Sequence, residues 1–188
     1  MTLDRQTLRY ELRQKRKQLT NAQQSDAAHD VLSQFLDALS PTPHSHLALY
    51  LTNDGEISPA EICQWCWSNN MNVFLPVLNG QALVFARYTQ TSQWQENRFG
   101  ILEPIDSTPL SGEEMDYVLM PLVGFDKKGD RLGMGGGFYD RTFEHKAKRT
   151  KLIGLAHDCQ EVTELPTASW DVPLAGILTP TRFIRCDR

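Results

Sequence analysis

Apolar residues at helical spacing mark the first forty positions of the chain. Residues 5–18 are rich in strong helix formers, and TNAQ at 20–23 has the spacing of a capping box. The apolar positions that follow share one helical face: Ala28, Val31, Leu32, Phe35 and Leu39. Pro41 and Pro43 then end the pattern. It predicts two helices before any strand.

From residue 46 the apolar runs become short and continuous, which is typical of buried strands. Residues 46–51 and 71–78 flank SPAE at 58–61, which matches a capping box with proline at the first helical position. This order predicts a strand–helix–strand unit. Residues 82–88 predict another strand, joined to the preceding one by a hairpin turn at Asn79-Gly80.

Three later runs also predict strands, at 117–122, 151–156 and 175–179, with a helix at 137–149 between two of them. Because the runs do not alternate with polar residues, we expect a mostly parallel sheet covered on both faces. The predicted fold is α/β, a three-layer α/β/α arrangement with a mostly parallel central sheet, preceded by the two N-terminal helices. A length of 188 residues suits a single domain over 1–188.

The charge distribution is uneven. Six of the 19 lysines and arginines lie in residues 1–20, beside two of the 23 acidic residues, and the whole chain has a net charge of −4. A basic N-terminal segment on an otherwise acidic protein suits a phosphate-containing ligand better than an extended nucleic-acid-binding surface. No run approaches the roughly 18 apolar residues of a membrane span, and the first residues lack the apolar core of a signal peptide. We therefore expect a cytoplasmic protein without a membrane partner.

The four cysteines give little sign of chemistry. Cys63 and Cys66 have the CxxC spacing of redox and zinc motifs, but they fall more than a turn inside a predicted helix. Cys159 and Cys186 form no second CxxC motif. We expect buried structural thiols.

The segment 120–141 (MPLVGFDKKGDRLGMGGGFYDR) holds six of the 12 glycines and leads into a predicted helix. Such a loop is suited to cradle phosphate, yet it is neither a Walker A loop nor GxGxxG, since Phe138 replaces the third glycine. Arg131 is suited to pair with a phosphate, and we expect it outside the core. Asp140 is suited to reach a phosphate-bound magnesium ion, or is simply an acid favoured in a first helical turn.

Two further features have both a functional and a structural interpretation. Arg5, Arg9 and Arg13 share one helical face, which is usually solvated but becomes a candidate clamp beside a phosphate. Glu56 follows a predicted strand, where α/β proteins gather ligands, and its carboxylate suits the paired N–H groups of a heterocycle. Alternatively it belongs to a solvated turn, because Asn53-Asp54-Gly55 is a strong turn signal.

Four segments, in order, resemble the 5-formyltetrahydrofolate cyclo-ligase family, also called methenyltetrahydrofolate synthetases. They are RQTLR, LYLTNDGEI, GFDKKGDRLGMGGGFYDR and WDVPLAGILTP. The resemblance covers nearly the whole chain, and the third segment is the most specific. It implies an α/β three-layer fold and an ATP- and magnesium-dependent conversion of 5-formyltetrahydrofolate to 5,10-methenyltetrahydrofolate, with release of ADP and phosphate.

The resemblance also implies roles for individual residues. The ATP-binding set would be Arg5 (in place of a common lysine), Arg9, Arg131, Leu132, Gly133, Met134, Gly135, Gly136, Gly137, Phe138 and Tyr139. The folate-binding set would be Leu51, Glu56, Phe99, Met134, Gly135, Gly136, Gly137 and Phe138. Magnesium would be held by Asp140 and Asp171, and the catalytic pair would be Arg131 and Asp140.

Two positions depart from the family pattern. Some members carry a basic residue at the position of Gly136, and some carry an aspartate at the position of Ala175, which leaves Asp171 as the nearby acid. In the implied reaction the formyl oxygen attacks the γ-phosphate of ATP, a folate nitrogen closes the ring, and phosphate leaves. Positioning and charge neutralisation dominate such chemistry, so no protein nucleophile is required.

Two other functions fit parts of the sequence. A sugar-phosphate isomerase or related α/β enzyme would use the glycine loop without ATP, and a nucleic-acid-binding protein would use the basic first helix. The acidic remainder of the chain disfavours the second. We expect a monomer that binds ATP and 5-formyltetrahydrofolate, with or without a polyglutamate tail, and no nucleic acid.

Overall fold

Two helices open the computed structural model, which describes residues 4–186. Helix α1 (Arg5–Lys17) is capped by Asp4, whose carboxylate accepts the Thr7 N–H at 2.9 Å. Helix α2 (Asn21–Ala38) begins with the predicted capping box, in which Thr20 and Gln23 exchange hydrogen bonds at 3.1 and 2.8 Å. Both predicted N-terminal helices are confirmed.

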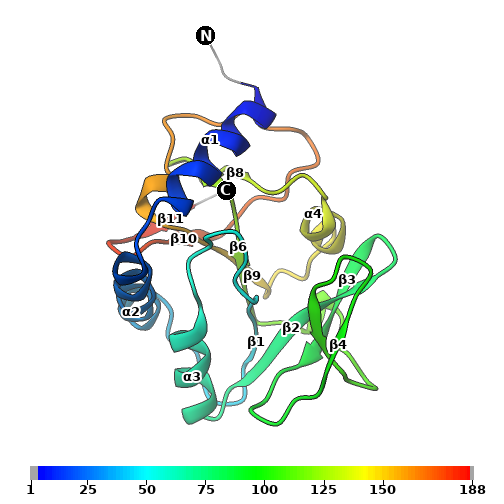
Figure 1. Cartoon of the computed structure of the whole chain (residues 1–188). Coiled ribbons are helices and arrows are strands. Elements are labelled where there is room, and N and C mark those ends of the chain that lie inside the picture. The colour runs from blue at the N-terminus through cyan, green and yellow to red at the C-terminus, as the bar shows by residue number, and fades with distance from the viewer. Residues whose placement is uncertain (1–3, 187–188) are drawn as a thin grey trace.

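A seven-stranded sheet in the order β11-β10-β9-β6-β1-β2-β3 forms the centre of the molecule (Figure 1). The strands are β1 (His46–Ala48), β2 (Asn72–Asn79), β3 (Ala82–Arg87), β6 (Tyr117–Pro121), β9 (Lys151–Leu155), β10 (Gly176–Leu178) and β11 (Phe183–Arg185). The five inner strands pair in parallel, and the two edge strands are antiparallel. The mostly parallel sheet and the β2–β3 hairpin are therefore confirmed, although the turn residues are Gly80 and Gln81, because Asn79 still pairs with Ala82.

Several shorter elements were not predicted, because their runs are too short to show a period. They are the edge strand β11, the 3₁₀ turns η1 (Gly112–Glu114) and η2 (Asp158–Gln160), and two two-stranded ribbons, β4 (Trp94–Glu96) with β5 (Leu102–Pro104) and β7 (Gly124–Phe125) with β8 (Arg131–Leu132).

Two predicted helices differ in detail from the observed ones. The predicted capping box at 58–61 is wrong, because α3 (Ala60–Ser68) starts one residue later, with Pro59 as its N-cap. The Ser58 hydroxyl accepts the nearby Ala60 N–H at 3.1 Å instead. Helix α4 (Phe138–Phe143) is shorter than the predicted 137–149 helix and ends at a turn after Phe143.

Apolar side chains cover both faces of the sheet. Leu47 and Val73 pack on one side with α2 and α3, whereas their neighbours Ala48 and Phe74 pack on the other with Phe143 of α4. This alternation within continuous apolar runs is why each strand needs cover on both faces. The three-layer prediction is confirmed. No helix within residues 4–186 is both long and apolar enough to cross a membrane.

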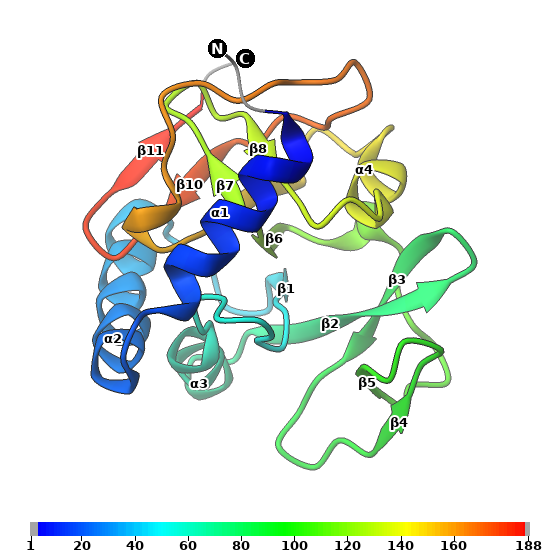
Figure 2. The ribbon, with the colours of Figure 1, turned by 45° about the horizontal axis from the view of Figure 1, so that its top comes forward.

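Helix α1 lies outside these layers. It crosses β7 and β8 (Figure 2), where Leu8 packs with Leu132 and Leu165. A Cβ at Gly124 would meet Leu12 at 2.5 Å, so only glycine permits this close approach. The α1 side chains also reach the segments that follow β1 and β6, because Arg16 donates to the backbone carbonyls of Asp54 and Leu122. The helix therefore closes over the carboxyl ends of these parallel strands.

Candidate active site

A cavity of about 480 Å³ lies between α1, the ends of β1 and β6, and the glycine segment. Its lining brings together most of the residues singled out in the sequence: Arg5, Arg9, Glu56, Arg131, Gly133, Met134, Gly135, Gly136, Gly137, Phe138, Tyr139, Asp140 and Asp171. It also includes Ile101 and Trp170, for which no sequence pattern indicated a role. A larger, more open groove of about 720 Å³ lies beside it and shares Glu56, but none of the glycine loop.

The glycine loop, residues 133–137, connects β8 to α4 and is held from two sides. Arg9 of α1 donates from Nε to the carbonyl of Gly133 at 2.7 Å. Gly135 has φ +103°, a conformation that side chains rarely adopt, and a Cβ there would lie 3.4 Å from the Arg9 guanidinium carbon. The loop therefore places backbone directly against a cation.

Arg141 holds the other side of the loop and was missed in the sequence. Its Nη2 donates to the Gly136 carbonyl and its Nε to the Gln81 carbonyl, both at 2.6 Å. Its guanidinium also lies over the Phe138 ring, 5.0 Å from the centroid. Arg141 is the last residue of the glycine-rich segment 120–141. Its position one helical turn after Gly137 was the sequence signal that it would reach the loop.

Arg131 is buried, so the expectation that it lies outside the core is wrong. It belongs to strand β8, and its side chain is only 7% exposed. The guanidinium is ion-paired with Asp140, whose Oδ1 also accepts the Val172 N–H at 3.0 Å. Its Nε is buried without a hydrogen-bond partner among the described residues. Such an orphaned donor is costly unless a ligand supplies an acceptor.

Asp171 is ion-paired with Arg5, so the second expected magnesium ligand also faces an arginine. The Arg5 Nη1 to Asp171 Oδ2 distance is 2.8 Å, and the same Oδ2 accepts the Ala168 N–H at 2.8 Å. Burial alone would raise the pKa of Asp171, but the hydrogen bonds from Arg5 and Ala168 outweigh it and lower that pKa. Asp171 is therefore a carboxylate at neutral pH.

The carboxylates in the cavity suit a metal ion that takes only one or two of its ligands from the protein. Among residues 4–186 there is no group of three or more histidine, cysteine, aspartate or glutamate side chains arranged to hold a metal ion. Magnesium commonly needs one or two carboxylates from the protein and takes its remaining ligands from phosphate and water. Asp140 and Asp171, which line one cavity, match that requirement.

Glu56 closes a tight turn that also lines the cavity. Its backbone N–H donates to the Asn53 carbonyl at 3.1 Å, and its carboxylate accepts the Asn53 N–H at 2.9 Å. Burial raises the pKa of Glu56, and the Asn53 N–H partly offsets this effect. Burial, followed by the Glu56 charge, raises the pKa of Tyr139 above its ordinary value. A half-buried carboxylate and a neutral phenol thus lie near each other in the cavity lining.

Four other predicted residues lie apart from this lining. Leu132 is fully buried, with Leu8 and Leu165 packed against it, so its side chain is not available to a ligand. Leu51 is 39% exposed and borders a separate cavity of about 120 Å³ with Cys63. Phe99 is exposed, but its ring meets Phe138 edge-on at 6.2 Å, so it lies next to the glycine loop. Arg13 follows Arg9 on the same helical face but binds Asp54, outside this lining.

The cysteines are buried as expected, with the exception of the half-buried Cys159. All four are free thiols. Burial raises the pKa of Cys63 and of Cys66 to about 12, so neither forms a reactive thiolate at neutral pH. The structural interpretation of the CxxC pair is confirmed.

Comparisons with known proteins agree on one family. A model described as the 5-formyltetrahydrofolate cyclo-ligase family matches residues 1–180. The 5-formyltetrahydrofolate cyclo-ligase of Haemophilus influenzae is 44% identical over 185 residues, covering 94% of this chain and 98% of that protein. The protein of the same name from Escherichia coli strain K12 is 38% identical over 180 residues, covering 91% and 97%.

The fold is similar to that of a solved protein. The NMR structure of Aquifex aeolicus 5,10-methenyltetrahydrofolate synthetase matches with a TM-score of 0.85 at 25% sequence identity. The match covers 98% of this chain and 93% of that chain. The similarity therefore includes both the sheet and the N-terminal helices.

Proposed function

This chain belongs to the 5-formyltetrahydrofolate cyclo-ligase family, whose members are ligases, and we propose that it converts 5-formyltetrahydrofolate to 5,10-methenyltetrahydrofolate with ATP and magnesium. ADP and phosphate would be the other products. The observation that carries the proposal is that the cationic glycine loop and Glu56 line the same cavity. Phosphate and a heterocycle would thus meet in a single site.

The glycine loop and its arginines would bind the nucleotide. Arg5, Arg9 and Arg131 contribute three guanidinium groups to the cavity lining. The buried, unpartnered Nε of Arg131 is a donor that a phosphate oxygen would satisfy. Because Gly136 carries no charge, these arginines and the metal would neutralise the phosphates together.

Asp140 and Asp171 would hold magnesium with their carboxylates, and phosphate and water would supply its remaining ligands. When bound, magnesium would offset charge on the phosphates and so favour phosphoryl transfer. Both aspartates are ion-paired with arginines, Asp171 with Arg5 and Asp140 with Arg131. Nucleotide binding would then let each arginine contact phosphate while its aspartate contacts the metal.

The part of the cavity around Glu56 would bind the folate. Glu56 would accept N–H groups of the pterin, as its two carboxylate oxygens allow. Exposed apolar side chains at Ile101, Met134 and Trp170 line the same cavity and would pack against the aromatic parts of the substrate. Phe99, beside Phe138, would extend this surface.

The residues present suit a reaction that depends on positioning. The formyl oxygen would attack the γ-phosphorus as the bond to the ADP oxygen breaks. The N10 nitrogen of the folate would then attack the formyl carbon and lose its proton, and phosphate would leave with the former formyl oxygen. The chain would hold the two substrates in line and neutralise the transferred charge, with no covalent protein intermediate.

A coupled assay tests the proposal. The protein is incubated with 5-formyltetrahydrofolate, ATP and magnesium, and the methenyl product and ADP are both quantified. We expect equal amounts of the two products and no turnover when any one component is omitted. Product without ATP, or ADP release without folate conversion, would contradict the proposal. A sugar-phosphate isomerase would need no nucleotide, so the same omissions separate that alternative. A cytoplasmic monomer without a nucleic-acid partner remains part of the proposal.

A further inference from the structure

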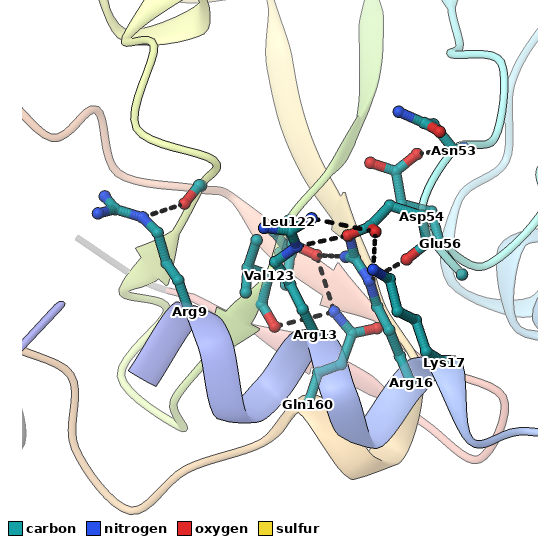
Figure 3. A network of polar contacts seen from close by, with 12 residues as sticks. Arg9, Arg13, Arg16, Lys17, Asn53, Asp54, Glu56, Leu122, Val123 and Gln160 are labelled. Carbon is teal, nitrogen blue, oxygen red and sulfur yellow. Dashed lines mark hydrogen bonds and ion pairs between the residues drawn. The ribbon is translucent and has the colours of Figure 1, made fainter. Parts of the chain in front are cut away.

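Three cationic side chains of α1 converge on one aspartate outside the predicted site. Asp54 accepts from Arg13 Nε at 2.6 Å, from Arg16 Nη2 at 2.9 Å and from Lys17 Nζ at 2.6 Å (Figure 3). The Asp54 side chain is 12% exposed. Arg13, Arg16 and Lys17 lie at spacings of three and four residues, so all three reach the same side of the helix.

Arg16 is the centre of this network because its side chain is fully buried. Besides the Asp54 carboxylate, it donates to the backbone carbonyl of Asp54 at 2.7 Å and to that of Leu122 at 3.1 Å. Gln160 donates to the same Leu122 carbonyl at 2.8 Å and to Val123 at 3.0 Å. Arg16 thus joins the turn after β1 to Leu122, which directly follows β6 and lines the active-site cavity.

The turn that carries Asp54 needs external support. Asp54 has φ +56° and Gly55 has φ +76°, and left-handed backbone at a residue other than glycine is uncommon. Gln24 and His157 donate to the Gly55 carbonyl at 3.1 and 3.2 Å. Glu56, the next residue, has its carboxylate in the cavity wall and bonded to Asn53, at the start of the same turn.

We propose that Asp54 is a positioning residue that sets the place of the Glu56 carboxylate relative to Arg9 and the glycine loop. The inference rests on the proposed function and deepens it. Arg9 lies one turn before Arg13 on α1 and donates to the Gly133 carbonyl. One helix therefore contacts the glycine loop through Arg9 and the turn that leads to Glu56 through Arg13 and Arg16.

The two ends of α1 are not equally dependent on Asp54. The first half of the helix is also held by the Arg5–Asp171 ion pair and by Leu8 against Leu132. Without the Asp54 carboxylate, Arg16 would be a buried cation lacking its counterion, which is strongly unfavourable. The turn would shift to relieve it, and Glu56 would move with the turn, while Arg9 would stay at the glycine loop.

The test compares Asp54→Asn with the parent in the coupled assay. The substitution keeps the size of the side chain and removes the charge that pairs with Arg16. We expect the KM for 5-formyltetrahydrofolate to rise about tenfold, since small misplacements in a site are costly, with the KM for ATP changed less than about twofold. Activity is expressed per folded molecule, with the folded fraction measured by circular dichroism.

Lys17→Gln is the second variant. It removes one of the three cations at a half-exposed position, so folding should persist and the folate KM should rise less, in the same direction. Glu164→Gln is the matched control, because it breaks an exposed pair with Lys128 at 2.7 Å outside the cavity lining. Its KM values should equal those of the parent.

The outcomes separate this inference from the proposed function. A selective rise in folate KM in Asp54→Asn, or in Lys17→Gln if the first variant does not fold, supports positioning. Lower thermal stability with both KM values unchanged in the folded variants overturns it and leaves Asp54 a stabilising residue only. A parent protein without turnover overturns the proposed function, and this inference with it.

Discussion

Arg131 donates from Nη2 to Oδ1 of Asp140 and so joins strand β8 to the first turn of helix α4 across the glycine loop. The two residues are nine positions apart and both line the cavity. Their side chains are largely buried, with exposed fractions of 7% and 16%. The expected phosphate ligand and the expected metal ligand are therefore one structural unit, and a change to either affects the other.

Replacing Arg131 with alanine should reduce both folding stability and ATP binding. It leaves the Asp140 carboxylate largely buried without a counterion, so we expect the free energy of unfolding to fall by about 3 kcal/mol or more. The lost phosphate contact should weaken ATP binding by about 1.5–3 kcal/mol. Urea denaturation and ATP titration measure the two effects.

Arg149→Ala is the control for that change. It breaks an exposed ion pair with Asp116 at 3.0 Å and should cost less than about 1 kcal/mol of stability. Equal ATP affinity in Arg131→Ala and in the parent would remove Arg131 from the nucleotide site.

Asp140→Asn should raise the magnesium requirement. The amide oxygen still accepts the Val172 N–H, but the charge that attracts a hard cation and pairs with Arg131 is lost. We expect lower stability, most turnover lost, and more magnesium needed for the activity that remains. Activity per folded molecule is measured across a magnesium titration. Normal turnover at an unchanged magnesium concentration would limit Asp140 to its structural role.

Glu56→Gln should act on folate and leave ATP affinity nearly unchanged. The amide oxygen still accepts the Asn53 N–H, so the turn is kept, but the second acceptor and the negative charge are lost. We expect a higher KM for 5-formyltetrahydrofolate, measured at saturating ATP. A defect confined to the KM for ATP would show that Glu56 belongs to the ATP-binding part of the site.

The stability supplied by Asp54 should disappear in acid. The hydrogen bond from Arg13, together with those from Lys17 and Arg16, holds the pKa of Asp54 well below its ordinary 3.8, against the opposing effect of burial. Because the folded-state pKa is lowered, the unfolded chain binds the proton first as the pH falls, and the contribution is complete only above about pH 4. Urea denaturation between pH 2.5 and 6, at about half-unit steps, should show the stability difference between the parent and Asp54→Asn shrinking below about pH 4. A difference that is constant across this range would contradict the assignment.

Gly135→Ala should destabilise the glycine loop, whereas Gly133→Ala should be tolerated by the fold. Gly135 has φ +103°, where a side chain costs about 1–3 kcal/mol, and its Cβ would approach Arg9. At Gly133 φ is not left-handed, and a Cβ would lie at an ordinary 3.5 Å from Arg131. Thermal unfolding of both variants checks the difference. Equal losses of stability would mean that the backbone conformation of Gly135 does not constrain the loop.

The sequence by itself determined the elements and the region of the site. Periodicity and capping signals located α1, α2 and the inner strands, because these features depend on residues within a few positions of one another. The cluster of glycines marked the loop for a similar reason, since the need for left-handed backbone at Gly135 and Gly137 is local.

Only the tertiary structure decided what each charged side chain contacts. Arg9 and Arg13 share a helical face, yet one binds the glycine loop and the other binds Asp54, 41 positions away. Arg16, within a basic run, is fully buried, because Asp54 and the Leu122 carbonyl meet it there. The fate of an ionic group depends on its desolvation and on partners distant in sequence, and both are set by packing and not by local spacing.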